Sequence, residues 1–245
     1  MCLIVFAYKT LPGQKLLLAA NRDEFYNRPA EPARQRGDIL CGIDLKGGGT
    51  WLGITRSGRF AALTNYRDLK NIRPDAPSRG ALVMDFLRGS MSAAEYTLQL
   101  TGKSAQYNGF NLLVMDNHEM LCYSNITDKA ILLSPGIYGL SNALLDTPWR
   151  KNLTAKQGLA ELISRGETDE EHLLKLMQDE THAPDDELPD TGAGFALEKI
   201  LSPVFIKSPG YGTRCTTILK ISDEGIYQFT EVSYDEKGKT MNNLR

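Results

Sequence analysis

The residue of this sequence best suited to covalent chemistry is the cysteine at position 2. A thiol is a weak nucleophile until a neighbouring group takes its proton or lowers its pKa. Removal of the initiator methionine would give Cys2 a free α-amine, and such amines titrate at about pH 7.7 to 8.0 in peptides, which suits a general base. Cys2 could then supply both the nucleophile and the base. The alternative is that Cys2 is a small buried apolar residue, as free cysteines often are.

Two apolar runs near the start of the chain are predicted to form a β-hairpin that brings polar groups to Cys2. The runs cover residues 2–8 and 15–20, and Pro12-Gly13 makes the turn between them. In an antiparallel hairpin, the start of one strand lies beside the end of its partner. The tetrapeptide Asn21-Arg22-Asp23-Glu24, which follows the second run, is therefore expected close to Cys2.

The composition is that of an ordinary globular protein. The chain has 245 residues, of which 42% are hydrophobic and 24% charged, and its formal net charge is -2. This length suits one large domain over residues 1–245, and the sequence contains no evident linker or internal repeat. The nearly balanced charge gives no reason to expect a nucleic acid partner.

The first apolar run also bears on the location of the protein. It is too short for a signal peptide core or a membrane-spanning helix, so we expect a cytoplasmic protein without stable membrane insertion. Cys2, Cys41, Cys122 and Cys215 show no C-x-x-C spacing and no nearby histidine cluster. The sequence therefore predicts neither a metal site nor disulfide bonds.

Strand and helix patterns occur in blocks along the chain. Further strands are predicted at residues 46–55, 59–64, 110–115, 120–123, 131–133, 138–141, 215–221 and 226–234. Helices are predicted at residues 78–89, 92–102, 148–163, 169–179 and 195–201. Residues 25–43 are expected to be irregular, and the polar tail after residue 235 is expected to be frayed. Strand hairpins at both ends with helices between them favour an α+β fold, in which helices cover antiparallel sheets.

Six motifs spread over the whole chain carry a resemblance to a known family. They are Met1-Cys2, Ala20-Asn21-Arg22-Asp23-Glu24-Phe25, Gly48-Gly49-Thr50-Trp51-Leu52-Gly53, Leu63-Thr64-Asn65-Tyr66-Arg67, Ser78-Arg79-Gly80 and Tyr211-Gly212-Thr213-Arg214. They resemble the NRDE family, which is named for the Asn-Arg-Asp-Glu tetrapeptide and includes the transport and Golgi organisation protein 2 of animals. That family is similar to the N-terminal-nucleophile (Ntn) hydrolases, above all to cysteine amidases such as bile salt hydrolase and penicillin V acylase. The resemblance implies a four-layer αββα sandwich.

The resemblance also implies catalytic roles for individual residues. Cys2 would be the nucleophile, and Asp23 would be the carboxylate that binds its α-amine. Asn65 and Asn142 resemble the two asparagines of the amidase pocket, and the first of them would help to form the oxyanion hole. Arg214 resembles the late arginine, a cation that would lower the pKa of the thiol.

Three further residues are expected to contact the substrate by the same resemblance: Asn21, Arg22 and Trp51. The chain departs from the amidases at one of these positions. The amidases carry an arginine directly before their Asn-x-Asp segment, whereas this chain has Ala20 there and carries Arg22 within the segment.

Two functions follow from this resemblance. The first is hydrolysis of the C–N amide bond of a small acyl substrate, which needs no cofactor. The second is a carrier without chemistry that holds haem or an acyl-CoA-like ligand in the same pocket. The sequence offers little for haem, because it has no C-x-x-C-H motif, no Cys-Pro pair and only the histidines His118, His172 and His182. A trafficking protein that must release its ligand can, however, lack strong axial ligation.

Overall fold

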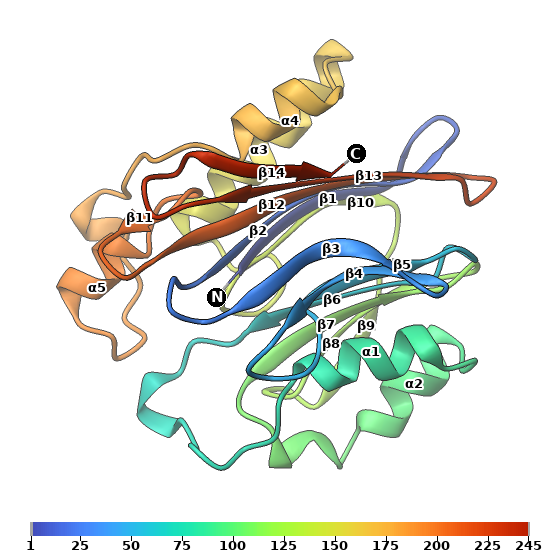
Figure 1. Ribbon diagram of the computed structural model, residues 1–245, viewed down its shortest axis with the longest axis horizontal. Helices are drawn as coiled ribbons and strands as arrows, with labels where there is room; N and C mark the ends of the chain where they lie inside the picture. The colour runs from blue at the N-terminus through green and yellow to red at the C-terminus, as the bar shows by residue number, and fades with distance from the viewer. Residues whose placement is uncertain (1, 245) are drawn as a thin grey trace.

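The computed structural model describes residues 2–244, which form two antiparallel sheets of seven strands each. The sheets pack face to face, and helices cover the outer face of each sheet (Figure 1). This arrangement is the four-layer αββα sandwich of an α+β protein, as the sequence predicts.

The first sheet is built around the N-terminal strand. Its strands, in spatial order, are β10 (Gly136–Leu140), β1 (Cys2–Leu11), β2 (Gln14–Phe25), β12 (Tyr211–Ser222), β13 (Tyr227–Tyr234) and β14 (Thr240–Leu244), and β11 (Lys207–Ser208) pairs with β12. The predicted hairpin of β1 and β2 is therefore present. The late strand β12 pairs with β2 on the side away from β1. The end of β2 therefore lies between the start of β1 and a strand from the far end of the sequence.

The second sheet follows the order of the sequence. Its strands are β3 (Ala30–Arg36), β4 (Ile39–Asp44), β5 (Leu52–Thr55), β6 (Phe60–Asn65), β7 (Phe110–Met115), β8 (Met120–Ser124) and β9 (Lys129–Leu132). Each strand pairs antiparallel with the next strand of the chain, which is the pattern expected for short connections.

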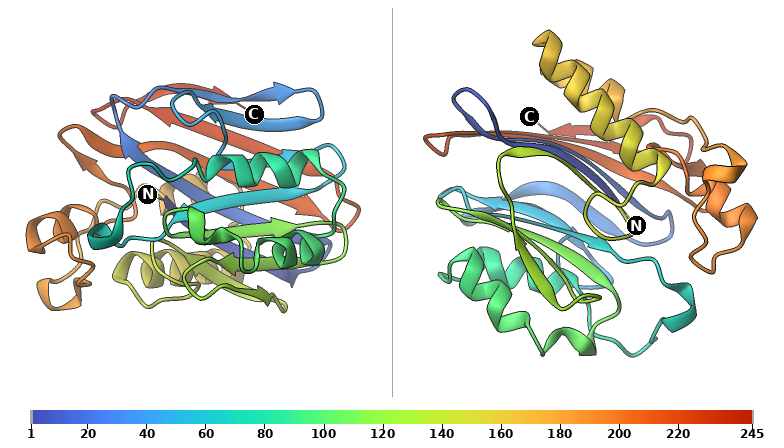
Figure 2. Two further views of the ribbon diagram at one scale, coloured as in Figure 1. Left: turned by 90° about the horizontal axis from the view of Figure 1, so that it is seen from below. Right: turned by 180° about the vertical axis from the view of Figure 1, so that it is seen from behind.

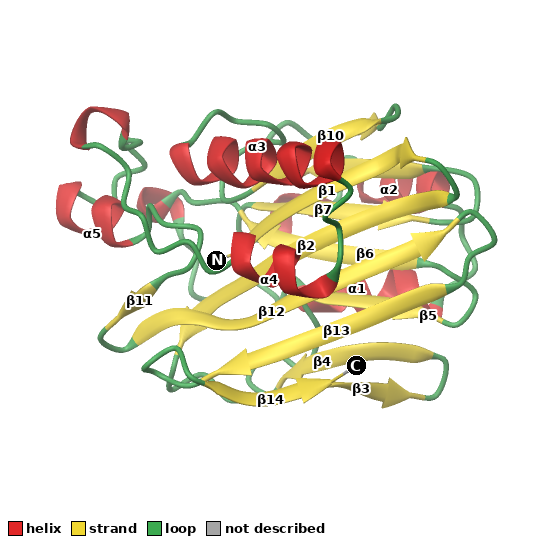
Figure 3. Cartoon of the chain, turned by 90° about the horizontal axis from the view of Figure 1, so that it is seen from above, coloured by secondary structure: helices red, strands yellow, loops and turns green. Residues whose placement is uncertain are grey.

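The helices are α1 (Gly80–Arg88), α2 (Ala93–Leu100), α3 (Arg150–Arg165), α4 (Glu170–Leu176) and α5 (Phe195–Ile200). Most of the helices lie on the two outer faces, whereas α5 lies beside one end of the sheets (Figures 1 and 2). Helices α3 and α4 lie over the first sheet (Figure 3), whereas α1 and α2 cover the second. The capping box that begins α2 is present as predicted, between Ser92 and Glu95. Within residues 2–244, every helix is too short or too polar to cross a membrane.

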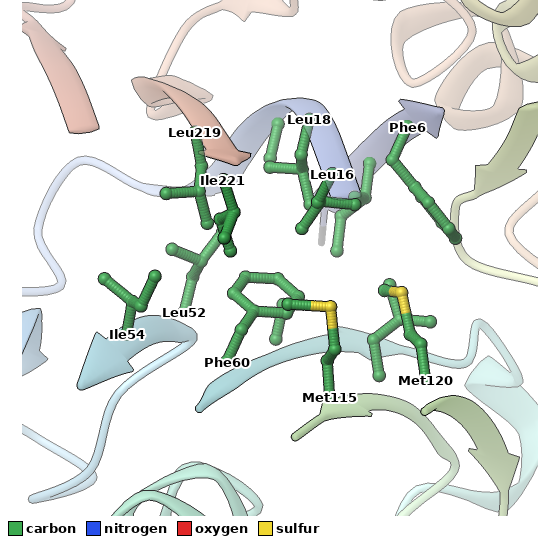
Figure 4. Packing of buried hydrophobic residues seen from close by; sticks show 14 of the residues in the cluster. Phe6, Leu16, Leu18, Leu52, Ile54, Phe60, Met115, Met120, Leu219 and Ile221 are labelled. Carbon is green, nitrogen blue, oxygen red and sulfur yellow. The ribbon is translucent and has the colours of Figure 1, made fainter. Parts of the chain in front are cut away.

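Alternation along β1 explains the layers. Its odd-numbered residues Leu3 and Val5 pack against α3 and α4, whereas Ile4 and Phe6 point between the two sheets. There they join a central core whose side chains interdigitate between the sheets (Figure 4). Since successive side chains of a strand point to opposite faces, Cys2 lies on the inner face with Ile4.

Two segments that the sequence predicts to be irregular form strands instead, at one edge of each sheet. Residues 25–43 contain β3 and most of β4, and the tail after residue 235 contains β14. Strand β3 tolerates Pro32 because it is an edge strand with a bulge between Glu31 and Arg34, where a missing N–H costs no ladder bond. Strand β14 is polar because it closes the edge of the first sheet, and Leu244 alone packs on the central core.

Gly49, in the segment before β5, lies directly against Gly80, the first residue of α1. A Cβ added to Gly49 would lie 2.8 Å from the backbone nitrogen of Ala81 and even nearer to the backbone of Gly80. We expect Gly49→Ala to lower the free energy of unfolding by about 3 kcal/mol, because neither backbone can yield. Gly48→Ala is the matched control, because its φ is +71° but nothing lies within 4 Å, so it should cost only roughly 1–2 kcal/mol. Equal losses in urea unfolding would contradict this prediction.

Candidate active site

Cys2 begins β1 and faces Arg22 across the hairpin, as the sequence predicts. Its thiol is partly buried, and the backbone N–H of Asp23 donates to the sulfur. Burial raises the pKa of the Cys2 thiol, while Arg22 and the Asp23 N–H favour the thiolate and oppose this rise. The position of Met1, and therefore the question of its removal, lies outside the described residues.

Arg22 is the cation closest in register to the thiol. Its guanidinium lies over the ring of Trp51, 4.3 Å from the centroid, and its Nη2 donates to Asp44 Oδ2 at 3.1 Å. Cys2, Arg22 and Trp51 line one small cavity of about 10 Å³ between the sheets. Arg22 therefore lies beside the Cys2 thiol although it falls within the Asn-x-Asp segment rather than before it.

Asp23 is buried on the other face of β2, at the end of the strand. Its Oδ1 accepts a hydrogen bond from Thr213 Oγ1 at 2.8 Å. Burial raises the pKa of the Asp23 carboxyl, and the charge of Lys151 is the largest influence that lowers it again. Because Asp23 follows Arg22 directly, its carboxylate lies near the backbone at the start of β1.

The two asparagines of the predicted pocket lie next to each other but differ in their surroundings. Asn142 is fully buried, and its Nδ2 donates to the backbone oxygen of Asn65 at 2.9 Å. The backbone N–H of Arg67 donates to the backbone oxygen of Asn142 at 2.7 Å, so Asn142 fixes the end of β6. The side-chain amide of Asn65 lines the large cleft described below and forms no hydrogen bond within residues 2–244.

Two predicted site residues point elsewhere. Asn21 donates to the backbone oxygens of Met177 (2.8 Å) and Val204 (2.9 Å), so it ties the sheet to the helical layer. Arg214 donates from Nη1 to the backbone oxygens of Phe25 and Tyr26, which places its guanidinium at the turn after β2. The structure does not bring these two side chains to the thiol.

A large cleft opens beside this cluster. Its volume is about 770 Å³, and it is lined by residues of β2, the segment after β6, α5 and the start of β12. Its apolar walls are Phe25, Leu69, Ile72, Ala105, Ile126, Leu197, Ile200, Leu201 and Pro209. Several of these apolar side chains are exposed, so the cleft offers apolar surface to a ligand.

Two polar residues of the cleft wall lie near Cys2. Burial raises the pKa of Tyr211 well above its usual value, and the charges of Asp23, Glu24 and Cys2 add to this effect. The Tyr211 hydroxyl has no hydrogen-bond partner within residues 2–244. Arg79 donates to the backbone oxygen of Gly109 and forms no ion pair within the same range. Burial lowers the pKa of Arg79, whereas Cys2 acts to raise it.

Comparison with known proteins shows the family to which the chain belongs. The model of the family described as Transport and Golgi organisation 2 matches residues 1–236. The Transport and Golgi organization protein 2 homolog of Bos taurus is 39% identical over 258 residues, which cover 95% of this chain and 93% of the bovine protein. The chain belongs to the Transport and Golgi organisation 2 family.

The fold of this family member is that of Ntn-hydrolase amidases. The N-acylethanolamine-hydrolyzing acid amidase ortholog of Caenorhabditis elegans superposes with a TM-score of 0.52 and 13% identity, over 91% of this chain and 93% of that chain. The C2A mutant of conjugated bile acid hydrolase from Clostridium perfringens also gives a TM-score of 0.52, with 11% identity over 99% and 97% of the two chains. At such low identity, the likeness establishes the fold alone.

Four polar residues that line cavities around the candidate site are absent from the residues predicted for it: Arg67, Arg79, Lys151 and Tyr211. Arg67, Arg79 and Tyr211 fall within the motifs quoted above. The sequence therefore marked their positions but did not indicate what these residues do. No sequence pattern marked Lys151, because a lysine in an amphipathic helix is ordinarily a solvated residue.

Proposed function

We propose that this chain is an Ntn-type cysteine amidohydrolase that cleaves the C–N bond of an acyl amide through Cys2. The observation that carries the proposal is the position of Cys2. The thiol begins β1, lies opposite a buried arginine, receives the N–H of Asp23 and lines a small cavity between the sheets. The cleft with apolar walls opens at Glu24 and Phe25, at the end of the strand that pairs with β1. A thiol beside a cation and an N–H donor has the surroundings that favour a thiolate nucleophile.

The reaction would proceed in two steps. The Cys2 sulfur attacks the amide carbonyl carbon, the C–N bond breaks, and the amine leaves with a proton supplied by the Cys2 α-amine. Water then attacks the thioester and releases the carboxylic acid, so one water is consumed for each amide. The Asn65 amide and the Tyr211 hydroxyl are the available donors for the oxyanion of both steps.

The cleft suits the acyl part of such a substrate. Its apolar walls would hold a hydrocarbon chain, and Arg79 lines the cleft with no carboxylate pairing its charge within residues 2–244. A group with partial or full negative charge near the scissile bond would be stabilised there.

Acyl transfer to the enzyme tests the proposal directly. Protein whose intact mass shows loss of Met1 is incubated with fluorogenic acyl amides of increasing chain length, and both turnover and protein mass are followed. We expect a thioester adduct on Cys2 that hydroxylamine removes. If protein without Met1 neither forms an adduct nor releases the amine with any chain length, the hydrolase proposal is wrong.

A carrier function is the second candidate, and one observation favours it. Cys2 lines only the small cavity of about 10 Å³ and is absent from the lining of the large cleft. A ligand could therefore occupy the cleft without reaching the thiol. Haem fits this cleft poorly, because the described residues that line it include no histidine, cysteine or methionine and leave only tyrosine hydroxyls as axial ligands. An acyl-CoA-like ligand suits the apolar walls and arginines better.

Ligand titration separates the two candidates. A carrier should bind an acyl-CoA at one site, with an affinity that Cys2→Ala leaves unchanged. An enzyme should show turnover that Cys2→Ala removes.

A further inference from the structure

Helix α5 has the opposite orientation to an ordinary surface helix. Its apolar side chains Phe195, Leu197 and Ile200 are 61%, 39% and 37% exposed, whereas its Glu198 is 3% exposed. The ion pair with the buried Arg67, at 2.9 Å, holds Glu198 inside. A surface helix usually buries its apolar residues and exposes its charged ones. The fold therefore turns the apolar side of α5 to solvent.

A second exposed apolar segment, residues 69–72, lines the same large cleft as α5. Leu69 and Ile72 are 39% and 56% exposed, and Phe25 and Ile126 of the cleft wall are 56% and 46% exposed. Among residues 2–244, fifteen large apolar side chains are exposed, and six of them, including two of α5, line this one cleft. These six side chains form the mouth of the cleft. Single exposed apolar residues are ordinary, but such a cluster marks an interaction site.

Cations without carboxylate partners lie at the same mouth. Arg73 and Arg79 line the cleft, and neither forms an ion pair within residues 2–244. Lys70, which is exposed in the second apolar segment, forms none within the same range. Two carboxylates line the cleft too, but Glu24 is paired with an arginine, which leaves Asp68 as the one unpaired carboxylate among the described residues of the lining. Unpaired cations beside exposed apolar side chains suit the surface of an anionic lipid bilayer.

The position of the cleft favours a bilayer over a protein partner. The cleft opens through the exposed apolar surface, because the same side chains form both. A protein seated on this surface would close the cleft to an acyl ligand. A bilayer would instead supply such a ligand, since acyl chains partition into lipid by about 0.8 kcal/mol for each buried CH₂ group.

We propose that the mouth of the cleft docks reversibly on the surface of an anionic lipid bilayer, with the apolar sides of α5 and of residues 69–72 in the headgroup region. Lys70 and Arg73 would face lipid phosphates there. An acyl chain would then pass from the bilayer into the cleft without crossing water. The inference holds for the hydrolase and for the carrier, because both take an acyl ligand.

Flotation with lipid vesicles tests this docking directly. The full chain is mixed at low salt with vesicles of phosphatidylcholine, alone or with about 30% phosphatidylserine, an anionic lipid. We expect the protein to float with the anionic vesicles, to bind phosphatidylcholine alone only weakly, and to be released as the salt concentration rises. The double variant Phe195→Ser with Ile72→Ser should weaken binding roughly tenfold or more, because two large apolar side chains lose their contact with the bilayer.

Two substitutions at the other end of the sheets are matched controls. Ile226 is 73% exposed in the turn between β12 and β13, at the opposite end of the first sheet from α5 (Figure 1), and Ile226→Ser should bind vesicles as the parent does. Lys70→Gln should weaken binding to the anionic vesicles about fivefold, since each lysine near such a surface contributes about 1 kcal/mol. Its control is Arg56→Gln, which removes an exposed cation from the turn between β5 and β6 and should have no effect.

Three results would overturn the inference. The first is a protein that stays away from the anionic vesicles at low salt, and the second is an equal loss of binding in Ile226→Ser. The third is a dimer in light scattering that Phe195→Ser separates, because the exposed surface would then belong to a second copy of the chain. Failure of the hydrolase proposal is distinguishable, since vesicle binding is measured without turnover.

Discussion

Replacing Cys2 by alanine is expected to lower kcat/KM for the best acyl amide by about 10⁴-fold or more, to the level of the background reaction. The reason is that the thioester cannot form without the sulfur, and none of the other described residues that line the cavity of Cys2 carries a thiol. Cys2→Ser keeps a weaker nucleophile in the same place and should retain a small part of the activity.

Cys122→Ala is the matched control for this substitution. Cys122 is a buried thiol of the central core between the sheets, away from the cleft and from the cavity of Cys2. Its loss should leave turnover within a few-fold of the parent but lower stability, since it creates a void in a packed core. Cys2→Ala, at a partly exposed strand end, should cost less stability than Cys122→Ala. Full turnover by Cys2→Ala would refute the nucleophile assignment.

Removing Arg67 should have the largest effect on stability. Arg67 and Glu198 form an ion pair with an Nη1–Oε2 distance of 2.9 Å, and their side chains are 2% and 3% exposed. The Arg67 guanidinium also lies over the Trp149 ring, 4.6 Å from its centroid. Arg67→Met would leave Glu198 as a buried charge without its cation, so we expect the free energy of unfolding to fall by roughly 3–5 kcal/mol in urea titration.

A surface pair of the same chemistry supplies the comparison. Arg150 and Glu187 are 3.4 Å apart with side chains 49% and 42% exposed, so Arg150→Met should cost less than about 1 kcal/mol. The double variant Arg67→Met with Glu198→Met should recover part of the loss, because no unpaired charge remains. Similar losses for Arg67→Met and Arg150→Met would show that the buried pair does not hold this region.

The buried pair also has a consequence for the cleft. Arg67 belongs to the segment after β6, and Glu198 belongs to α5, and both segments contribute walls of the cleft. The pair therefore joins two walls that come from distant parts of the sequence. Loss of ligand binding should accompany the loss of stability in Arg67→Met but not in Arg150→Met.

The sequence was sufficient for the architecture because strand and helix periodicities are local. The apolar run of residues 2–8, the capping box at Ser92 and the blocks of strands and helices predicted an α+β fold with helices on antiparallel sheets. The resemblance to the NRDE family implied the four layers, which the structure confirms. Prediction failed at β3, β4 and β14, of which β3 and β14 are edge strands. An edge strand needs neither an apolar face nor a complete set of N–H donors, so it can contain proline and many polar residues. Such a strand lacks the apolar pattern from which strands are predicted.

Within the candidate site, the sequence by itself determined the positions of the residues that the first hairpin carries. The placement of Arg22 and Asp23 at Cys2 follows from pairing between neighbouring strands. Only the tertiary structure decided that Lys151 is buried, that Arg67 pairs with Glu198, and that Arg214 turns away from the thiol. The physical reason is that the burial of a charge depends on segments that meet only after the sheets and helices have packed, and no local pattern of the sequence records that meeting.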